Sequence, residues 1–118
     1  GAVFFRVDAH SAEFKDFGEA KIIILFGSAL KGKRTYKDLD LLLVIKEQDY
    51  DRLMKRIEDK NKILLKPIHP IFQGIKDLKN NIIKEDEVVI NIIKTGVVIR
   101  GQEEIVEVIQ DVTSSKSY

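Results

Sequence analysis

The sequence predicts a single α/β (α+β) domain in which helices flank a small mixed β-sheet. Two observations lead to this fold class. Apolar runs of strand length alternate with amphipathic stretches of helix length, and no repeat or low-complexity linker interrupts them. The chain has 118 residues, of which 44% are hydrophobic, so it can bury one sizeable core but has little room for a second domain. We expect the domain to span residues 1–112 and to be followed by a disordered tail at 113–118.

The first half of the chain contains two strands that we expect to be buried on both faces. Residues 8–19 place alanine and phenylalanine among polar residues and predict a short amphipathic helix that ends near Gly18. Residues 21–26 and 39–45 are largely continuous apolar runs, which are typical of central strands. Residues 27–37, between these runs, are rich in glycine and lysine and predict a loop with room for one helical turn.

The second half of the chain predicts further helices and strands in alternation. Residues 49–60 carry apolar side chains at helical spacing and predict a crossover helix. Residues 63–72 predict an extended segment, but its two prolines lack backbone N–H donors, so we expect it at or near a sheet edge. Residues 85–94 predict a helix that stops at Gly96. The last expected elements are a short strand at 97–99 and an amphipathic helix at 102–112.

Composition excludes several classes of protein. Charged residues make up 33% of the chain with a net charge of +1, and the two signs are interspersed, so charge does not imply a nucleic-acid partner. The absence of cysteine rules out disulfides and thiolate metal sites. The apolar runs are too short to span a bilayer, and the beginning of the chain does not resemble a signal peptide. We therefore expect a cytoplasmic protein without a membrane partner.

Two carboxylates stand two residues apart where the second apolar run begins. Side chains at this spacing in a strand leave the same face, so Asp38 and Asp40 should lie together. Two carboxylates so close repel each other unless a cation lies between them. Magnesium takes one or two carboxylates together with substrate phosphates. The pair therefore predicts a Mg²⁺ site, although either aspartate taken alone would also suit the solvated start of a strand.

A glycine and a serine follow the first apolar run, where the chain must turn. Gly27 lets the backbone approach a ligand closely, and Ser28 offers a hydroxyl and an N–H to phosphate oxygens. Lys31, Lys33 and Arg34 add positive charge nearby. Taken alone, these residues would also suit an ordinary turn followed by a solvated loop. Together with the carboxylate pair, they predict a phosphate-binding turn beside a metal-binding site.

The combined motif resembles the signature of the DNA-polymerase-β-like nucleotidyltransferase superfamily. The resemblance lies in Leu-Phe-Gly-Ser at 25–28, Gly32, and Asp-Leu-Asp-Leu at 38–41. The closest similarity is to the minimal nucleotidyltransferases of archaea and bacteria. Residues 96–101 also resemble the short strand and turn that end many small members. The resemblance implies the nucleotidyltransferase fold.

The resemblance also implies an activity and roles for individual residues. Gly27, Ser28 and Lys37 would hold a nucleoside triphosphate, with ATP as the expected nucleotide. Asp38 and Asp40 would be catalytic and would ligate Mg²⁺, with room for two ions. The reaction would transfer a nucleoside monophosphate to a protein, RNA or small-molecule acceptor and release pyrophosphate.

The sequence departs from the family pattern at two positions. Lys37 stands where the family usually has a serine. Active members also bring a third carboxylate from a later strand, but the matching segment at 66–72 contains no acid. His69 stands about where that carboxylate is expected, and a histidine can act as a general base or bind a softer metal. Three alternatives therefore remain for the third catalytic group: it is His69, it is an acid from elsewhere such as Asp77, or it is missing.

The missing carboxylate leaves a second function open. A catalytically weak or inactive member would act through a protein partner, as in toxin–antitoxin pairs in which the nucleotidyltransferase-like chain is the antitoxin of a helical HEPN-type protein. The intact Gly-Ser and Asp-x-Asp motifs favour an enzyme, and the lost acid favours the antitoxin. A second copy of the chain is a further expected partner. A plain α/β binding module with a coincidental motif is the third alternative, to be discarded if Asp38 and Asp40 converge on Gly27 and Ser28.

Overall fold

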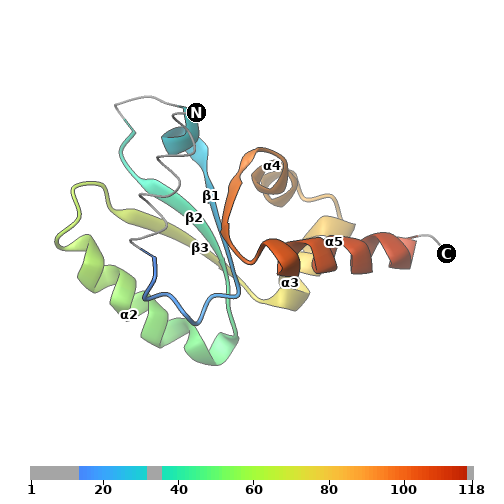
Figure 1. Cartoon of the computed structure of the whole chain (residues 1–118), viewed down its shortest axis with the longest axis horizontal. Helices are drawn as coiled ribbons and strands as arrows, with labels where there is room; N and C mark the ends of the chain where they lie inside the picture. The colour runs from blue at the N-terminus through green and yellow to red at the C-terminus, as the bar shows by residue number, and fades with distance from the viewer. Residues whose placement is uncertain (1–13, 32–35, 117–118) are drawn as a thin grey trace.

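The fold is a four-stranded mixed sheet with helices on both faces (Figure 1), which confirms the predicted fold class. A computed structural model of the chain describes residues 14–31 and 36–116. No helix in these two ranges is both long and apolar enough to cross a membrane. The elements, in chain order, are β1 (Ile22–Phe26), the 3-10 helix η1 (Gly27–Lys31), β2 (Leu39–Val44), the 3-10 helix η2 (Glu47–Asp49), α2 (Tyr50–Asn61), β3 (Ile68–Gln73), α3 (Ile75–Ile83), α4 (Glu87–Thr95), β4 (Val97–Arg100) and α5 (Gln102–Lys116).

The order of strands in the sheet is β3-β2-β1-β4. A short connection through η1 reverses the chain, so β1 and β2 are antiparallel. The crossover through α2 returns the chain in the same direction, so β2 and β3 are parallel. As predicted, β1 and β2 are central and buried on both faces. The proline-containing strand β3 lies at an edge, which confirms that prediction too.

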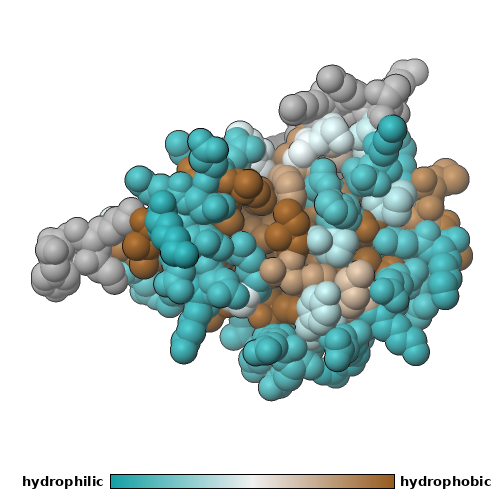
Figure 2. Space-filling model, turned by 180° about the vertical axis from the view of Figure 1, so that it is seen from behind, coloured by the Kyte–Doolittle hydropathy of each residue, from teal (hydrophilic) through white to brown (hydrophobic). Residues whose placement is uncertain are grey.

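Alternation along the strands divides the core between the two faces of the sheet. One face packs against α2 and is built from Ile23, Leu25, Leu39, Leu41, Leu43, Leu53 and Ile57. The other face packs against α3, α4 and α5 and is built from Ile22, Ile24, Leu42, Val44, Leu78, Val89, Ile92, Ile105 and Val108. Asp40 alternates with Leu41 and shares the face of Leu42, so it lies on the side of α3 to α5. Seen from behind, apolar surface gathers near the middle of the molecule between hydrophilic margins (Figure 2).

The helix predicted at 8–19 is wrong for its described part. The backbone around residues 14–19 forms turns, in which the N–H of Phe17 donates to the carbonyl of Phe14. Both rings are fully buried and stacked, and the guanidinium of Arg100 on β4 donates to both carbonyls. Burial of two aromatic rings and side-chain capping of the carbonyls replace helical hydrogen bonds. Residues 8–13 of the predicted helix lie outside the described residues.

The helices after β3 also differ from the predictions. Helix α3 was not predicted, because lysines and asparagines separate its apolar residues and only Leu78 is fully buried. Helix α5 continues to Lys116, so the first four residues of the predicted tail are helical. Val112 is buried near this end and holds the last turns on the core.

A partly buried ion pair links the turn before β1 to α2. The Glu19 carboxylate accepts two hydrogen bonds from the Arg56 guanidinium, at 2.6 and 2.9 Å. These bonds hold the pKa of the Glu19 carboxyl below its ordinary value, against the opposing effect of burial. Because the pKa is depressed in the folded state, the pair stabilises the fold above the ordinary glutamate pKa, and this stabilisation is lost as the pH falls through the folded-state value.

Replacing Glu19 with glutamine is therefore expected to destabilise the protein in a pH-dependent way. We expect the free energy of unfolding to fall by roughly 1–2 kcal/mol at pH 7, because the pair is bidentate and half-shielded from water. The difference from the wild type should vanish in acid, where the Glu19 carboxyl is neutral in both the folded and the unfolded protein. Urea unfolding at pH 7 and at acid pH measures this, with the exposed Glu58→Gln as control. An equal difference at both pH values would contradict the ionic origin of the stabilisation.

Candidate functional site

The candidate site lies where β1 ends and where β2 and β3 begin. In the antiparallel pair β1–β2, Phe26 faces Asp40. In the parallel pair β2–β3, the same Asp40 faces His69. Residues far apart in the sequence therefore meet at one end of the sheet. Gly27 follows directly from Phe26, so the predicted glycine and the predicted aspartate are neighbours in space.

The backbone at Gly27 requires a glycine for two separate reasons. Its φ angle is +81°, a conformation that other L-residues rarely adopt. A Cβ atom at this position would also lie 2.4 Å from Oδ2 of Asp40, which is much closer than non-bonded atoms come. The turn after β1 thus brings the backbone directly against the Asp40 carboxylate. Ser28 is half-buried in the following 3-10 helix η1, which Ala29 anchors in the core.

Leu39 is buried in the core on the α2 face, so Asp40, the next residue of β2, points to the opposite face. Asp38 lies directly before β2, so its placement on the same side as Asp40 stays a prediction. The N–H of Leu39 donates to the carbonyl of Pro67 at 2.9 Å, which ties this stretch to the beginning of β3. Both aspartates are partly exposed, and Lys37 directly before them is exposed.

His69 contacts Asp40 from the neighbouring strand. Its Nδ1 lies 3.1 Å from Oδ1 of Asp40, within hydrogen-bonding distance. An ionised carboxylate can only accept hydrogen bonds, so the hydrogen of this bond belongs to Nδ1. The side chain of His69 is 66% exposed whereas that of Asp40 is 23% exposed. Nε2 of the imidazole is therefore directed away from the carboxylate and is available to a ligand.

Two further side chains near the site belong to no sequence motif, and their contacts were not predicted. The ammonium group of Lys66 donates to the carbonyl of Tyr36 at 2.7 Å and lies 3.7 Å from the centre of the Tyr36 ring. This contact holds the backbone two residues before Asp38. The Asn61 side chain binds the backbone of Ile68 from the end of α2. No pattern in the sequence marks these contacts, since each joins segments that only the fold brings together.

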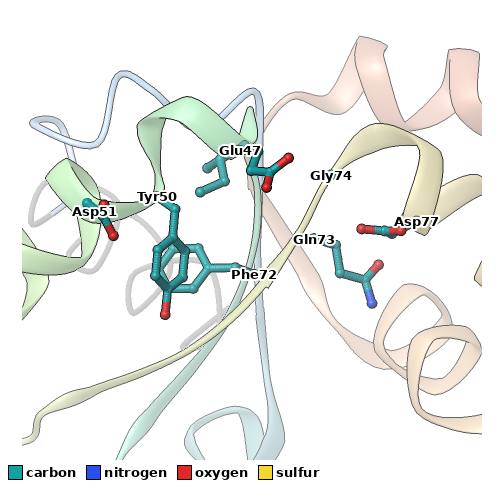
Figure 3. Close-up of a pocket in the computed structure, with 8 residues that line it drawn as sticks. Glu47, Tyr50, Asp51, Phe72, Gln73, Gly74 and Asp77 are labelled. Carbon is teal, nitrogen blue, oxygen red and sulfur yellow. The ribbon is translucent and has the colours of Figure 1, made fainter.

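Asp77 does not belong to this site, so its prediction as a third acid is wrong. It lies in the first turn of α3, past the far end of β3. From His69 to Gln73 the strand rises by about 3.3 Å per residue, which separates the two ends by about 13 Å. Asp77 instead borders a cavity of about 510 Å³ at the opposite end of the sheet, together with Glu47, Tyr50 and Phe72 (Figure 3).

The side chains at this end of the sheet include most of the groups that the sequence predicted for the site. Asp38, Asp40, Gly27 and His69 gather at one end of the sheet, and Ser28 and Lys37 flank them. Among the residues that the structure describes, no three His, Asp or Glu side chains form a group that could hold a metal. The third position beside Asp40 is occupied by an imidazole, not by a carboxylate.

Comparison with known proteins identifies the family. Searches of the curated proteins and of the solved structures returned no match. A family model described as a nucleotidyltransferase domain matches residues 7–108, which is most of the chain and includes the whole candidate site. The chain therefore belongs to the nucleotidyltransferase domain family.

Proposed function

We propose that this protein transfers a nucleoside monophosphate from a nucleoside triphosphate, ATP in the first place, to a hydroxyl group of an acceptor. Family membership supports the class of reaction. The observation that carries the proposal is the position of Asp40, which contacts His69 and packs against the backbone of Gly27. The acceptor would be a protein, an RNA or a small molecule.

The donor set of the site fits magnesium. Asp38 and Asp40 carry partly exposed carboxylates two residues apart at the beginning of β2, and hard cations bind one or two carboxylates together with phosphate oxygens. These two residues would hold one Mg²⁺ ion or two. When bound, the metal supplies positive charge that neutralises the triphosphate.

The other residues would bind and orient the nucleotide. Because Gly27 has no side chain, its backbone lies directly against the Asp40 carboxylate, and the N–H groups of this turn would bind phosphate oxygens next to the metal ligands. Ser28 would donate its hydroxyl and its N–H to the same phosphates. Lys37 would add positive charge next to Asp38.

We assign to His69 the proton transfer that other members give to a carboxylate. With Nδ1–H bonded to Asp40, the neutral ring carries a lone pair on Nε2. Nε2 would accept the proton of the acceptor hydroxyl while the hydroxyl oxygen bonds to the α-phosphorus. The bond from the α-phosphorus to the bridging oxygen breaks, and pyrophosphate leaves.

A second candidate is a nucleotide-binding protein without turnover. It would serve as the antitoxin of a HEPN-type partner, as in small toxin–antitoxin pairs, or would act in a complex with a second copy of the chain. The observation that favours it is the imidazole beside Asp40, because histidine is a poor ligand for Mg²⁺. The two candidates share the nucleotide site and differ in whether pyrophosphate is released.

Calorimetric titration with ATP and the other nucleoside triphosphates, with and without Mg²⁺, tests the proposed site. We expect Mg²⁺-dependent binding that the double variant Asp38→Asn/Asp40→Asn loses by roughly 100-fold or more, since each charge-assisted contact contributes about 1.5–3 kcal/mol. The variant Glu103→Gln/Glu107→Gln removes the same charge from exposed positions on α5 and should bind normally. Pyrophosphate release in the presence of acceptor would support the enzyme; binding without release would support the second candidate. No binding at millimolar nucleotide would refute both.

A further inference from the structure

A side chain of α2 binds the outer side of β3 where this strand begins. Strand β3 is at the edge of the sheet, and among the described residues no further strand pairs with its outer side. The carbonyl of Pro67 accepts from Leu39 on the β2 side. Since backbone groups alternate along a strand, Ile68 directs its N–H and C=O away from β2. These two groups would face solvent without a partner.

Asn61, the last residue of α2, binds both of these groups. Its Oδ1 accepts from the N–H of Ile68 at 2.8 Å, and its Nδ2 donates to the carbonyl of Ile68 at 2.9 Å. An amide is suited to this task, because it combines a donor and an acceptor in one plane, whereas a carboxylate only accepts. The side chain takes the place that a neighbouring strand would occupy.

His69 directly follows Ile68, the residue whose backbone Asn61 binds. Ile68 is 3% exposed and is held by the core on its side-chain side, by β2 on its inner side and by Asn61 on its outer side. Pro67 and Pro70 flank the pair, and a proline restricts both its own φ angle and the residue before it. The direction of the Cα–Cβ bond of His69 is therefore set by a backbone that Asn61 completes.

We propose that Asn61 is a positioning residue that keeps His69 at hydrogen-bonding distance from Asp40. Both of its side-chain hydrogen bonds go to the backbone of Ile68, and it would act on His69 through that backbone. The catalytic consequence rests on the proposed function of His69, whereas the effect on the His69–Asp40 contact does not. The alternative is that Asn61 only stabilises an exposed edge of the sheet.

Magnetic resonance of the His69 ring separates these two roles without any need for turnover. The chain has only two histidines, so in a His10→Gln background the imidazole signals belong to His69 alone. We expect Asn61→Ala to move the ¹⁵N and ¹³C signals of the ring toward those of Asp40→Asn, in which the hydrogen bond is weakened. The exposed Asn91→Ala in α4 is the matched control and should leave the ring unchanged. Unchanged ring signals in folded Asn61→Ala would overturn the proposal.

A second variant, Asn61→Asp, tests the proposal if Asn61→Ala does not fold. Asn61→Asp keeps the acceptor for the N–H of Ile68 and loses only the donor to its carbonyl, so we expect an intermediate displacement of the same ring signals. Ring signals identical to the wild type in this variant would also overturn the proposal.

Kinetics adds a readout that depends on the proposed function. We expect Asn61→Ala to lower kcat by about 10–100-fold, the range seen for partners that orient a functional histidine, and to leave the KM for the nucleotide unchanged. A rise in KM with unchanged kcat would contradict positioning of His69. If the wild type shows no turnover, the proposed function fails while the ring signals still decide the role of Asn61.

Discussion

Gly27→Ala is expected to impair folding stability and nucleotide binding together. The new methyl group would strain a backbone at φ +81° and would displace the Asp40 carboxylate, whose Oδ2 lies 2.4 Å from the position of the added Cβ. Left-handed strain costs of order 1–3 kcal/mol, which corresponds to a Tm lower by roughly 4–15 °C in a domain of this size. Displacement of a catalytic carboxylate by about 1 Å can lower activity by about 100-fold.

Two other glycines provide controls for this variant. Gly101 has a φ of +86° and is close to the backbone of β1, so Gly101→Ala should destabilise the fold to a similar degree. It does not contact Asp40, and we expect normal nucleotide binding below its melting temperature. No atom of the described residues lies within 4 Å of the position that a Cβ on Gly18 would take, so Gly18→Ala should change neither quantity. Thermal unfolding and calorimetry on the three variants test this pattern. Normal binding by folded Gly27→Ala would show that the Gly27–Asp40 contact does not shape the site.

His69→Ala should abolish most turnover with little effect on stability. The imidazole is 66% exposed, so its removal costs little packing. A general base contributes about 10²–10⁴-fold to a rate, and we expect kcat to fall within that range. Nucleotide affinity should stay near that of the wild type, because Nε2 is assigned to the acceptor and not to the triphosphate. Steady-state kinetics measures both quantities, with the fully exposed Leu65→Ala as control.

The variant His69→Asp distinguishes two roles for this position. It introduces the carboxylate that the resemblance of the sequence to nucleotidyltransferases led us to expect on this strand. If His69 acts only as a base held by Asp40, aspartate should restore little activity, since its charge repels the neighbouring carboxylate. Activity above the wild type, together with tighter Mg²⁺ binding, would instead identify the position as a metal ligand that this chain has lost. Unchanged kcat in His69→Ala would exclude both roles.

The sequence contained enough to predict the central strands and the edge strand of the sheet. Two continuous apolar runs predicted buried central strands, and β1 and β2 are the centre of the sheet. Two prolines predicted an edge strand, and β3 lies at an edge. Alternation in a strand is a local property, and it places Asp40 on the face opposite Leu39; Asp38 precedes β2, so its predicted place on the same face stays a prediction. The roles of these residues in binding and catalysis remain predictions.

Other features could not be predicted, because they depend on contacts between distant residues. The turns at 14–19 replace a plausible helix, since burial of two phenylalanines and capping by Arg100 from β4 outweigh local propensity. Helix α3 has a weak apolar pattern and owes its stability to packing on the sheet. Asp77 was a reasonable candidate for a third acid in the sequence, but the direction of β3 carries it to the opposite end of the sheet.

The sequence by itself determined which residues have the chemistry for this site, through a glycine turn after one buried strand and paired carboxylates at the start of the next. Only the tertiary structure decided how they are assembled. The parallel register of β2 and β3 sets His69 opposite Asp40, and the end of α2 brings Asn61 to the strand that carries His69. The physical reason is that local patterns record burial and backbone preference, whereas register and side-chain contacts arise from packing between segments remote in the chain.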